Sequence, residues 1–141
     1  MQMKNPDPCV IAHGCSLGAF HAVNIAARRP HLFKKIVAFS GRYDLTMAID
    51  HFQDLFEGFY NEEIYFNTPT HFLPNLSCSW LLRHLRALHI ILTIGEQDAF
   101  RGNNEHLSHI LHSKGIGHEF HLWRGIVHQG RDWRQMARLY V

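Results

Sequence analysis

The chain has 141 residues, of which 46% are hydrophobic and 18% charged. This composition supplies enough apolar side chains for a core, so disorder of the whole chain is excluded and residues 1–141 are expected to form a single domain. The formal net charge is only +2, and the basic residues are scattered singly or in pairs. We therefore expect no nucleic-acid partner and no binding to an anionic membrane.

Cysteine usage and the opening residues bear on the cellular compartment. Cys9, Cys15 and Cys78 form neither an even set nor a C-x-x-C pair, so no disulfide framework and no cysteine zinc site is predicted. The opening residues lack the apolar core of a signal peptide, and no stretch approaches the roughly 18 consecutive apolar residues of a membrane span. A cytoplasmic location is expected, unless a truncation before Met1 has removed a signal peptide.

Apolar runs alternate with helical spacing along the chain. The predicted elements, in chain order, are a strand over 9–12, a helix over 19–29, a strand over 36–40, short helices and loops over 46–76, a helix over 79–85, a strand over 87–94, a helix over 103–114, a strand over 118–123 and a helix over 133–140. Strands that alternate with helices favour a mostly parallel α/β sheet of about four strands.

A nucleophile motif joins the first predicted strand to the first helix. Gly14-Cys15-Ser16-Leu17-Gly18 matches G-x-S-x-G, in which a serine sits on a strained strand-to-helix turn. Glycine at Gly14 and Gly18 is expected to remove Cβ atoms that would clash in this elbow. The turn presents the Ser16 hydroxyl above the carboxyl edge of the sheet, and the backbone N–H of Leu17 points to where an oxyanion would form.

A serine nucleophile needs a histidine base and a carboxylate that orients the histidine. In this architecture the chain order is serine, acid, histidine. Asp98 follows the third predicted strand and His128 follows the fourth, so both are expected at the sheet edge that carries Ser16. Glu96, two residues before Asp98, and Asp44, after the second strand, remain alternative acids.

Other histidines recur along the chain without a convergent pattern. His106, His109 and His112 have i, i+3, i+6 spacing, which spreads them around a helix, so we interpret them as a solvated face and predict no metal site. His13 and His21 flank the elbow and are interpreted as packing or pocket-lining residues, because they lie too close in sequence to reach Ser16 from the required side.

Residues Gly14 to Leu45 resemble the putative esterase family of α/β-hydrolases, the esterase D-like group. The similarity continues through 65–69 and 72–76, then through His128 and 132–136, and so covers nearly the whole chain. It implies the C-terminal half of an α/β-hydrolase with Ser16 as nucleophile, His128 as base and Asp98 or Glu96 as acid. It also implies small acyl-ester substrates, including S-formylglutathione and esterified sugars, and no cofactor.

The chain departs from that family in its length before the elbow. Family members are about twice as long, and only 15 residues precede Ser16, against roughly 30 for one βαβ unit. The second oxyanion donor is therefore expected to be missing, a loss that typically costs about 10²–10³ in kcat. The first strand would form an open edge that pairs with a second copy or with a separate N-terminal chain.

The leading functional hypothesis is a serine esterase acting through an acyl-enzyme. The alternative is a catalytically impaired truncated hydrolase that acts as a binding module, and a third reading is an acyltransferase in which an alcohol replaces water. The aromatic segment from Phe52 to Phe72 is expected either to contribute to the substrate pocket or to serve as ordinary core and cover.

Overall fold

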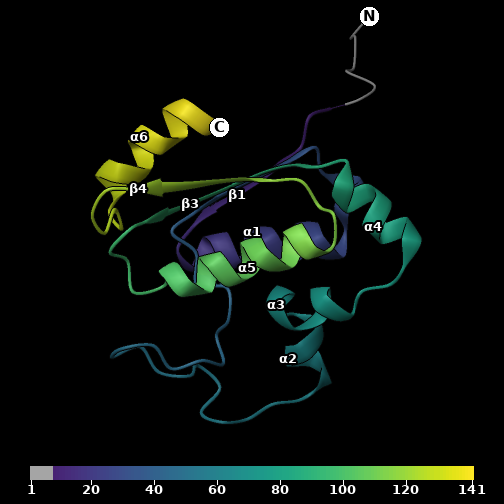
Figure 1. The fold of residues 1–141 in the computed structure, drawn as a ribbon, viewed down its shortest axis with the longest axis horizontal. Helices are drawn as coiled ribbons and strands as arrows, with labels where there is room; N and C mark the ends of the chain where they lie inside the picture. Colours follow the sequence, from purple (N-terminus) through teal and green to yellow (C-terminus); the bar gives the residue numbers. More distant parts are fainter. Residues whose placement is uncertain (1–7) are drawn as a thin grey trace, which may run out of the picture.

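The computed structural model describes residues 8–141 and contains four parallel strands in one sheet, with helices on both faces (Figure 1). The strands are β1 (Ile11–Cys15), β2 (Lys35–Phe39), β3 (His89–Gly95) and β4 (Glu119–Trp123). The helices are α1 (Leu17–Arg28), α2 (Glu62–Phe66), α3 (Pro69–Phe72), α4 (Ser79–Arg86), α5 (Arg101–Ser113) and α6 (Gly130–Tyr140), with short 3-10 turns η1 (Pro30–Leu32) and η2 (Leu73–Asn75).

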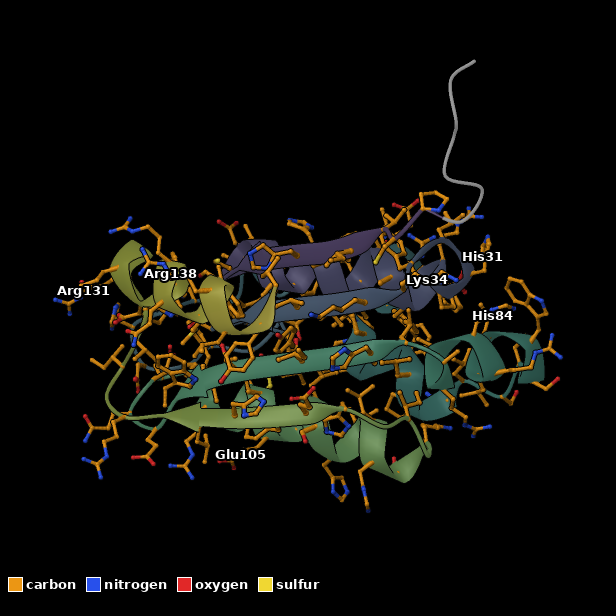
Figure 2. All side chains as sticks on the ribbon, turned by 90° about the horizontal axis from the view of Figure 1, so that it is seen from above. His31, Lys34, His84, Glu105, Arg131 and Arg138 are labelled. Atoms are coloured by element: carbon orange, nitrogen blue, oxygen red, sulfur yellow. The ribbon has the colours of Figure 1, made fainter. Side chains whose placement is uncertain are left out.

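The sheet follows the chain order β1-β2-β3-β4, and every pair is parallel. Each new strand is added on the same side of the strand before it, and the connection between two parallel strands is right-handed. The helices in these connections therefore all lie on the same face of the sheet. Figure 1 shows this arrangement, with α1 and α5 below the sheet and α6 above it. Seen from above, Lys34 and His84 lie at the amino ends of the strands, and Arg131 lies at the carboxyl ends (Figure 2).

Two apolar clusters hold the layers together, one on each face of the sheet. The larger cluster joins the sheet to α1, α3, α4 and α5, and it includes Val23, Leu92 and Leu107. The smaller one packs Met136 of α6 against Val37 and Phe39 of β2. Because β2 and β3 are central strands buried on both faces, they need continuous apolar runs, which the sequence supplies.

The structure confirms the predicted α/β class and the four-stranded parallel sheet, with shifts in element boundaries. β1 begins two residues later than expected and runs on to Cys15, because His13, Gly14 and Cys15 pair in register with β2. α6 begins at Gly130 instead of Trp133. Polar and small residues at element ends weaken the apolar pattern, so these boundaries come from pairing and packing.

The predicted solvated face of the helix over 103–114 is observed in α5. His106, His109 and His112 are all exposed, while Leu107 and Leu111 are buried toward the core. In residues 8–141, no helix is long and apolar enough to cross a membrane.

Candidate active site

Ser16 occupies the tight turn between β1 and α1. Its backbone has φ 56° and ψ −119°, a left-handed conformation that is uncommon for a residue with a side chain. The turn is held to the sheet because the Ser16 N–H donates to the Phe39 carbonyl, at 2.9 Å. The strained elbow that the motif predicts is therefore present, and it lies at the carboxyl end of β1.

Gly14 allows the elbow to close. A Cβ at Gly14 would lie 2.1 Å from the Gly18 carbonyl oxygen, so no larger residue fits while α1 starts where it does. At Gly18 the outcome differs from the expectation, since a Cβ there would meet no atom of the described residues within 4 Å. The close approach thus requires glycine at 14 and not at 18.

The structure brings Ser16, His128 and Asp98 together from three separate loops. His128 Nε2 lies 3.0 Å from Ser16 Oγ, and His128 Nδ1 lies 2.8 Å from Asp98 Oδ2. A carboxylate can only accept hydrogen bonds, so Nδ1 carries the ring proton that it donates to Asp98. Nε2 is then the basic nitrogen, and it accepts from the Ser16 hydroxyl.

The Asp98 carboxylate is fixed on both oxygens. Its Oδ2 accepts from His128, and its Oδ1 accepts the backbone N–H of Phe100 at 2.9 Å. The Asp98 side chain is only 3% exposed, so the carboxylate is shielded from water. Glu96, the neighbouring alternative acid, is exposed, and its backbone rather than its carboxylate bonds to Trp123 and Arg101.

Asp44, the other alternative acid, belongs to a different network. Its Oδ2 lies 2.8 Å from Nε2 of His71, and its Oδ1 accepts from the backbone and hydroxyl of Thr46. Burial alone would raise the pKa of Asp44, but the hydrogen bonds from Thr46 and the neighbouring His71 outweigh it and hold the pKa below its ordinary value. Asp44 therefore does not contact His128.

The loop that carries His128 is held by residues that the sequence motifs did not single out. The Ser40 hydroxyl donates to the Val127 carbonyl at 3.0 Å and accepts from the Trp133 indole N–H at 3.1 Å. The Trp133 ring also contacts the His128 ring edge to face. A Cβ at Gly95 would lie 2.2 Å from the Ile126 carbonyl oxygen, so glycine at the end of β3 lets this loop approach.

A small cavity of about 170 Å³ opens in front of the nucleophile. Its lining residues are Ser16, Leu17, Arg42, Leu45, Phe52, Leu55, Phe100 and His128. The cavity is therefore mostly apolar, with one cationic side chain, and Phe52 of the aromatic segment contributes to it. Phe72, at the other end of that segment, is instead buried in the core.

Larger hollows lie elsewhere on the molecule. One of about 770 Å³ lies against β1 and α1 and is lined by His13 and His21 among others. His13 donates its Nδ1–H to the Val37 carbonyl, 2.8 Å away, and neither histidine bonds to Ser16 within the described part of the chain. The geometry of the elbow thus singles out the smaller cavity as the candidate site.

Solved structures with the same fold include esterases, other hydrolases and an O-acetyltransferase. A ferulic acid esterase aligns with a TM-score of 0.71 at 16% identity, covering 90% of this chain and 46% of its own. The fluorophosphonate-binding serine hydrolase F of Staphylococcus aureus aligns with a TM-score of 0.70 at 16% identity, covering 92% and 51%. The S-formylglutathione hydrolase of the same organism gives 0.60 at 18% identity, covering 92% and 48%.

The chain therefore spans about half the length of each of these three solved structures. The search of curated proteins gave no match. The family model described as Putative esterase matches residues 2–136, nearly the whole chain. The predicted resemblance is confirmed, and the chain belongs to this esterase family.

Proposed function

We propose that this protein is a serine esterase that hydrolyses small carboxylic esters through an acyl-enzyme on Ser16. The observation that carries the proposal is the continuous hydrogen-bonded series Ser16–His128–Asp98, with spacings of 3.0 and 2.8 Å. These spacings lie within the range needed for proton transfer between nucleophile and base. Membership in an esterase family supports the same reaction class.

Each of the three side chains has a defined part in the reaction. His128 Nε2 takes the proton from Ser16 as Oγ attacks the ester carbonyl carbon, and it then gives that proton to the leaving alcohol. Asp98 holds the imidazole in the tautomer with the proton on Nδ1 and stabilises the imidazolium that forms. Water, activated by His128, releases the acid from the acyl-enzyme.

The first turn of α1 supplies a donor for the oxyanion. Leu17 is the first residue of α1, and the first N–H groups of a helix have no intrahelical acceptor. Its N–H adjoins the nucleophile, so it is placed to bind the carbonyl oxygen as negative charge develops there, a stabilisation often worth about 10²–10³ in kcat.

Burial raises the pKa of the adjacent Cys15 thiol, so this neighbour stays protonated at neutral pH.

The test is ester hydrolysis together with covalent labelling. Wild type, Ser16→Ala and the control Ser77→Ala, an exposed serine outside the site, would be compared on p-nitrophenyl acetate and butyrate and with a fluorophosphonate probe. We expect turnover and labelling in wild type and Ser77→Ala, and a loss of about 10⁶ in kcat in Ser16→Ala.

A folded wild-type chain that neither turns over these esters nor reacts with the probe would overturn the proposal. In that case the alternative of a catalytically impaired hydrolase acting as a binding module becomes the better account. Circular dichroism of each protein establishes folding before the kinetic comparison.

A further inference from the structure

Arg42 places a positive charge in the wall of the cavity that contains Ser16. It follows β2 by three residues and is only 8% exposed. Its Nη2 donates to the carbonyls of Met47 and Gln53, at 3.0 and 2.6 Å. These bonds fix the guanidinium against the loop that also supplies Phe52 and Leu55 to the cavity.

The hydrogen-bonding capacity of this guanidinium is only partly used. A guanidinium has five N–H donors, and Arg42 uses the two on Nη2. Within residues 8–141 the Nε–H has no acceptor and Nη1 makes no hydrogen bond. The Nε atom is too enclosed to meet a ligand, whereas Nη1 is accessible, so Nη1 is the donor left for one.

The charge itself also lacks an opposite partner. Within the described residues, no carboxylate forms an ion pair with Arg42. Its Cζ lies 5.4 Å from the centre of the Phe100 ring, in a cation–π contact. An arginine is protonated at every accessible pH, so it cannot relieve burial by losing its proton. Buried charges in proteins are normally paired or bound to an ion.

The rest of the cavity offers the cation no counter-charge. Leu45, Phe52, Leu55 and Phe100 are apolar, and the only other polar side chains in the lining are Ser16 and His128. A pocket that combines an unpaired cation with apolar walls beside a nucleophile is complementary to a small substrate with one anionic group. Charge-assisted hydrogen bonds between guanidinium and carboxylate are among the stronger contacts available for this.

We propose that Arg42 binds a carboxylate carried by the substrate, a few bonds from the ester that Ser16 attacks. This inference rests on the proposed esterase function and makes its substrate class specific: short esters with one free carboxylate. The carboxylate belongs either to the acyl group, as in a half-ester of a dicarboxylic acid, or to the alcohol, as in the acetyl ester of a hydroxy acid.

Two pairs of isosteric esters distinguish these sources. Monomethyl succinate is compared with methyl 4-methylpentanoate, and O-acetylglycolate with isobutyl acetate, so that each charged ester has a neutral counterpart of the same shape. The readout is the ratio of kcat/KM within a pair. This ratio does not change with the fraction of folded enzyme, so a merely structural role for Arg42 would leave it unmoved.

Three proteins are compared: wild type, Arg42→Gln, and Arg83→Gln, which removes one positive charge from an exposed position on α4. We expect the charged-to-neutral ratio of at least one pair to fall by about 10- to 100-fold in Arg42→Gln and to stay at the wild-type value in Arg83→Gln. The pair whose ratio falls identifies whether the carboxylate lies on the acyl or the alcohol side. Unchanged ratios for both pairs would overturn the inference.

A binding measurement separates this inference from the esterase proposal. Calorimetric titration of Ser16→Ala with monomethyl succinate and with O-acetylglycolate is compared with the Ser16→Ala/Arg42→Gln double variant. If binding depends on Arg42 while wild type neither turns over p-nitrophenyl esters nor reacts with the fluorophosphonate probe, the esterase proposal fails and carboxylate recognition stands. If the wild type hydrolyses esters but neither the ratios nor the binding depends on Arg42, the esterase proposal stands and carboxylate recognition by Arg42 fails.

Discussion

Asp98 and Glu96 lie two residues apart at the same end of β3, yet their surroundings differ. Asp98 is buried and bonds to both His128 and the Phe100 N–H, whereas the Glu96 side chain is exposed. The acid that orients a catalytic histidine must be close to it and shielded from water. The surroundings of the two carboxylates thus favour Asp98 as the acid of the proposed reaction.

Substitution of each acid in turn tests this choice. In Asp98→Asn, the amide at position 98 is expected to favour the wrong tautomer of His128, and kcat should fall by about 10⁴. Glu96→Gln removes a charge of the same sign two residues away and should change kcat by less than about threefold, since an exposed charge is screened. Equal losses in the two variants, measured on p-nitrophenyl acetate, would contradict the assignment.

The lowered pKa of Asp44 makes the stability of the fold depend on pH. Its pKa is lower in the folded chain than its ordinary value, so the folded state binds this proton less readily than the unfolded state does. The stability that Asp44 contributes is therefore fully present above the unfolded pKa of about 3.9 and is lost as pH falls through the lower folded value.

Asp44→Asn should therefore be destabilised relative to wild type at pH 7, by about 1–3 kcal/mol for a charged hydrogen-bonded group. The difference between the two proteins should shrink as the pH falls from 5 to 3. Urea unfolding midpoints measured across this range check the prediction, and a difference that stays constant with pH would show that the carboxylate charge is not what stabilises the fold.

At the scale of elements, the site depends on how closely the loop before α6 packs on the end of β3. Gly95 leaves room for the Ile126 carbonyl, and the Ser40 hydroxyl after β2 holds the Val127 carbonyl. Val127 has a positive φ of 44°, a strained conformation that these contacts maintain. His128 therefore takes its position from two neighbouring strands as well as from its own loop.

Gly95→Ala tests the packing of this loop. The added Cβ would lie 2.2 Å from the Ile126 carbonyl oxygen, so the loop must move and displace His128 from Ser16. We expect kcat to fall by at least about 10², as small misplacements of a catalytic group commonly do. Gly102→Ala is the matched control, because its Cβ would meet no described atom within 4 Å and alanine favours a helix by about 0.5–1 kcal/mol. A Gly95→Ala enzyme with wild-type kcat would contradict the packing argument.

Continuous apolar runs made β2 and β3 predictable to within two residues, because strands buried on both faces need such runs. The extension of β1 through His13 and Gly14 was not predictable from hydrophobicity, since it follows from pairing with β2. Contacts between residues distant in sequence likewise determine where Arg42, Ser40 and Gly95 lie. The motifs identified the elbow and narrowed the acid to three candidates, and only the packed loops distinguish Asp98 from Glu96.

At the scale of the whole molecule, the β1 edge of the sheet is open and apolar. β1 pairs with β2 on one side, and within residues 8–141 no strand pairs with its other side. Val10 and Ile11 at this edge are 42% and 36% exposed, and the 770 Å³ hollow beside them is lined in part by Ile25 and Phe33. An apolar strand edge is a template for pairing with another strand.

We therefore expect this chain to self-associate through β1, with a second copy as the partner. Ile11→Lys should weaken the association, because a charge at an edge strand opposes edge-to-edge pairing. Leu139→Lys, at an exposed apolar position on α6, serves as the control and should associate like wild type. Size-exclusion chromatography with light scattering over a concentration series measures this directly. A wild-type chain that stays monomeric at every concentration would contradict self-association, and equal weakening by both lysines would place the contact elsewhere than β1.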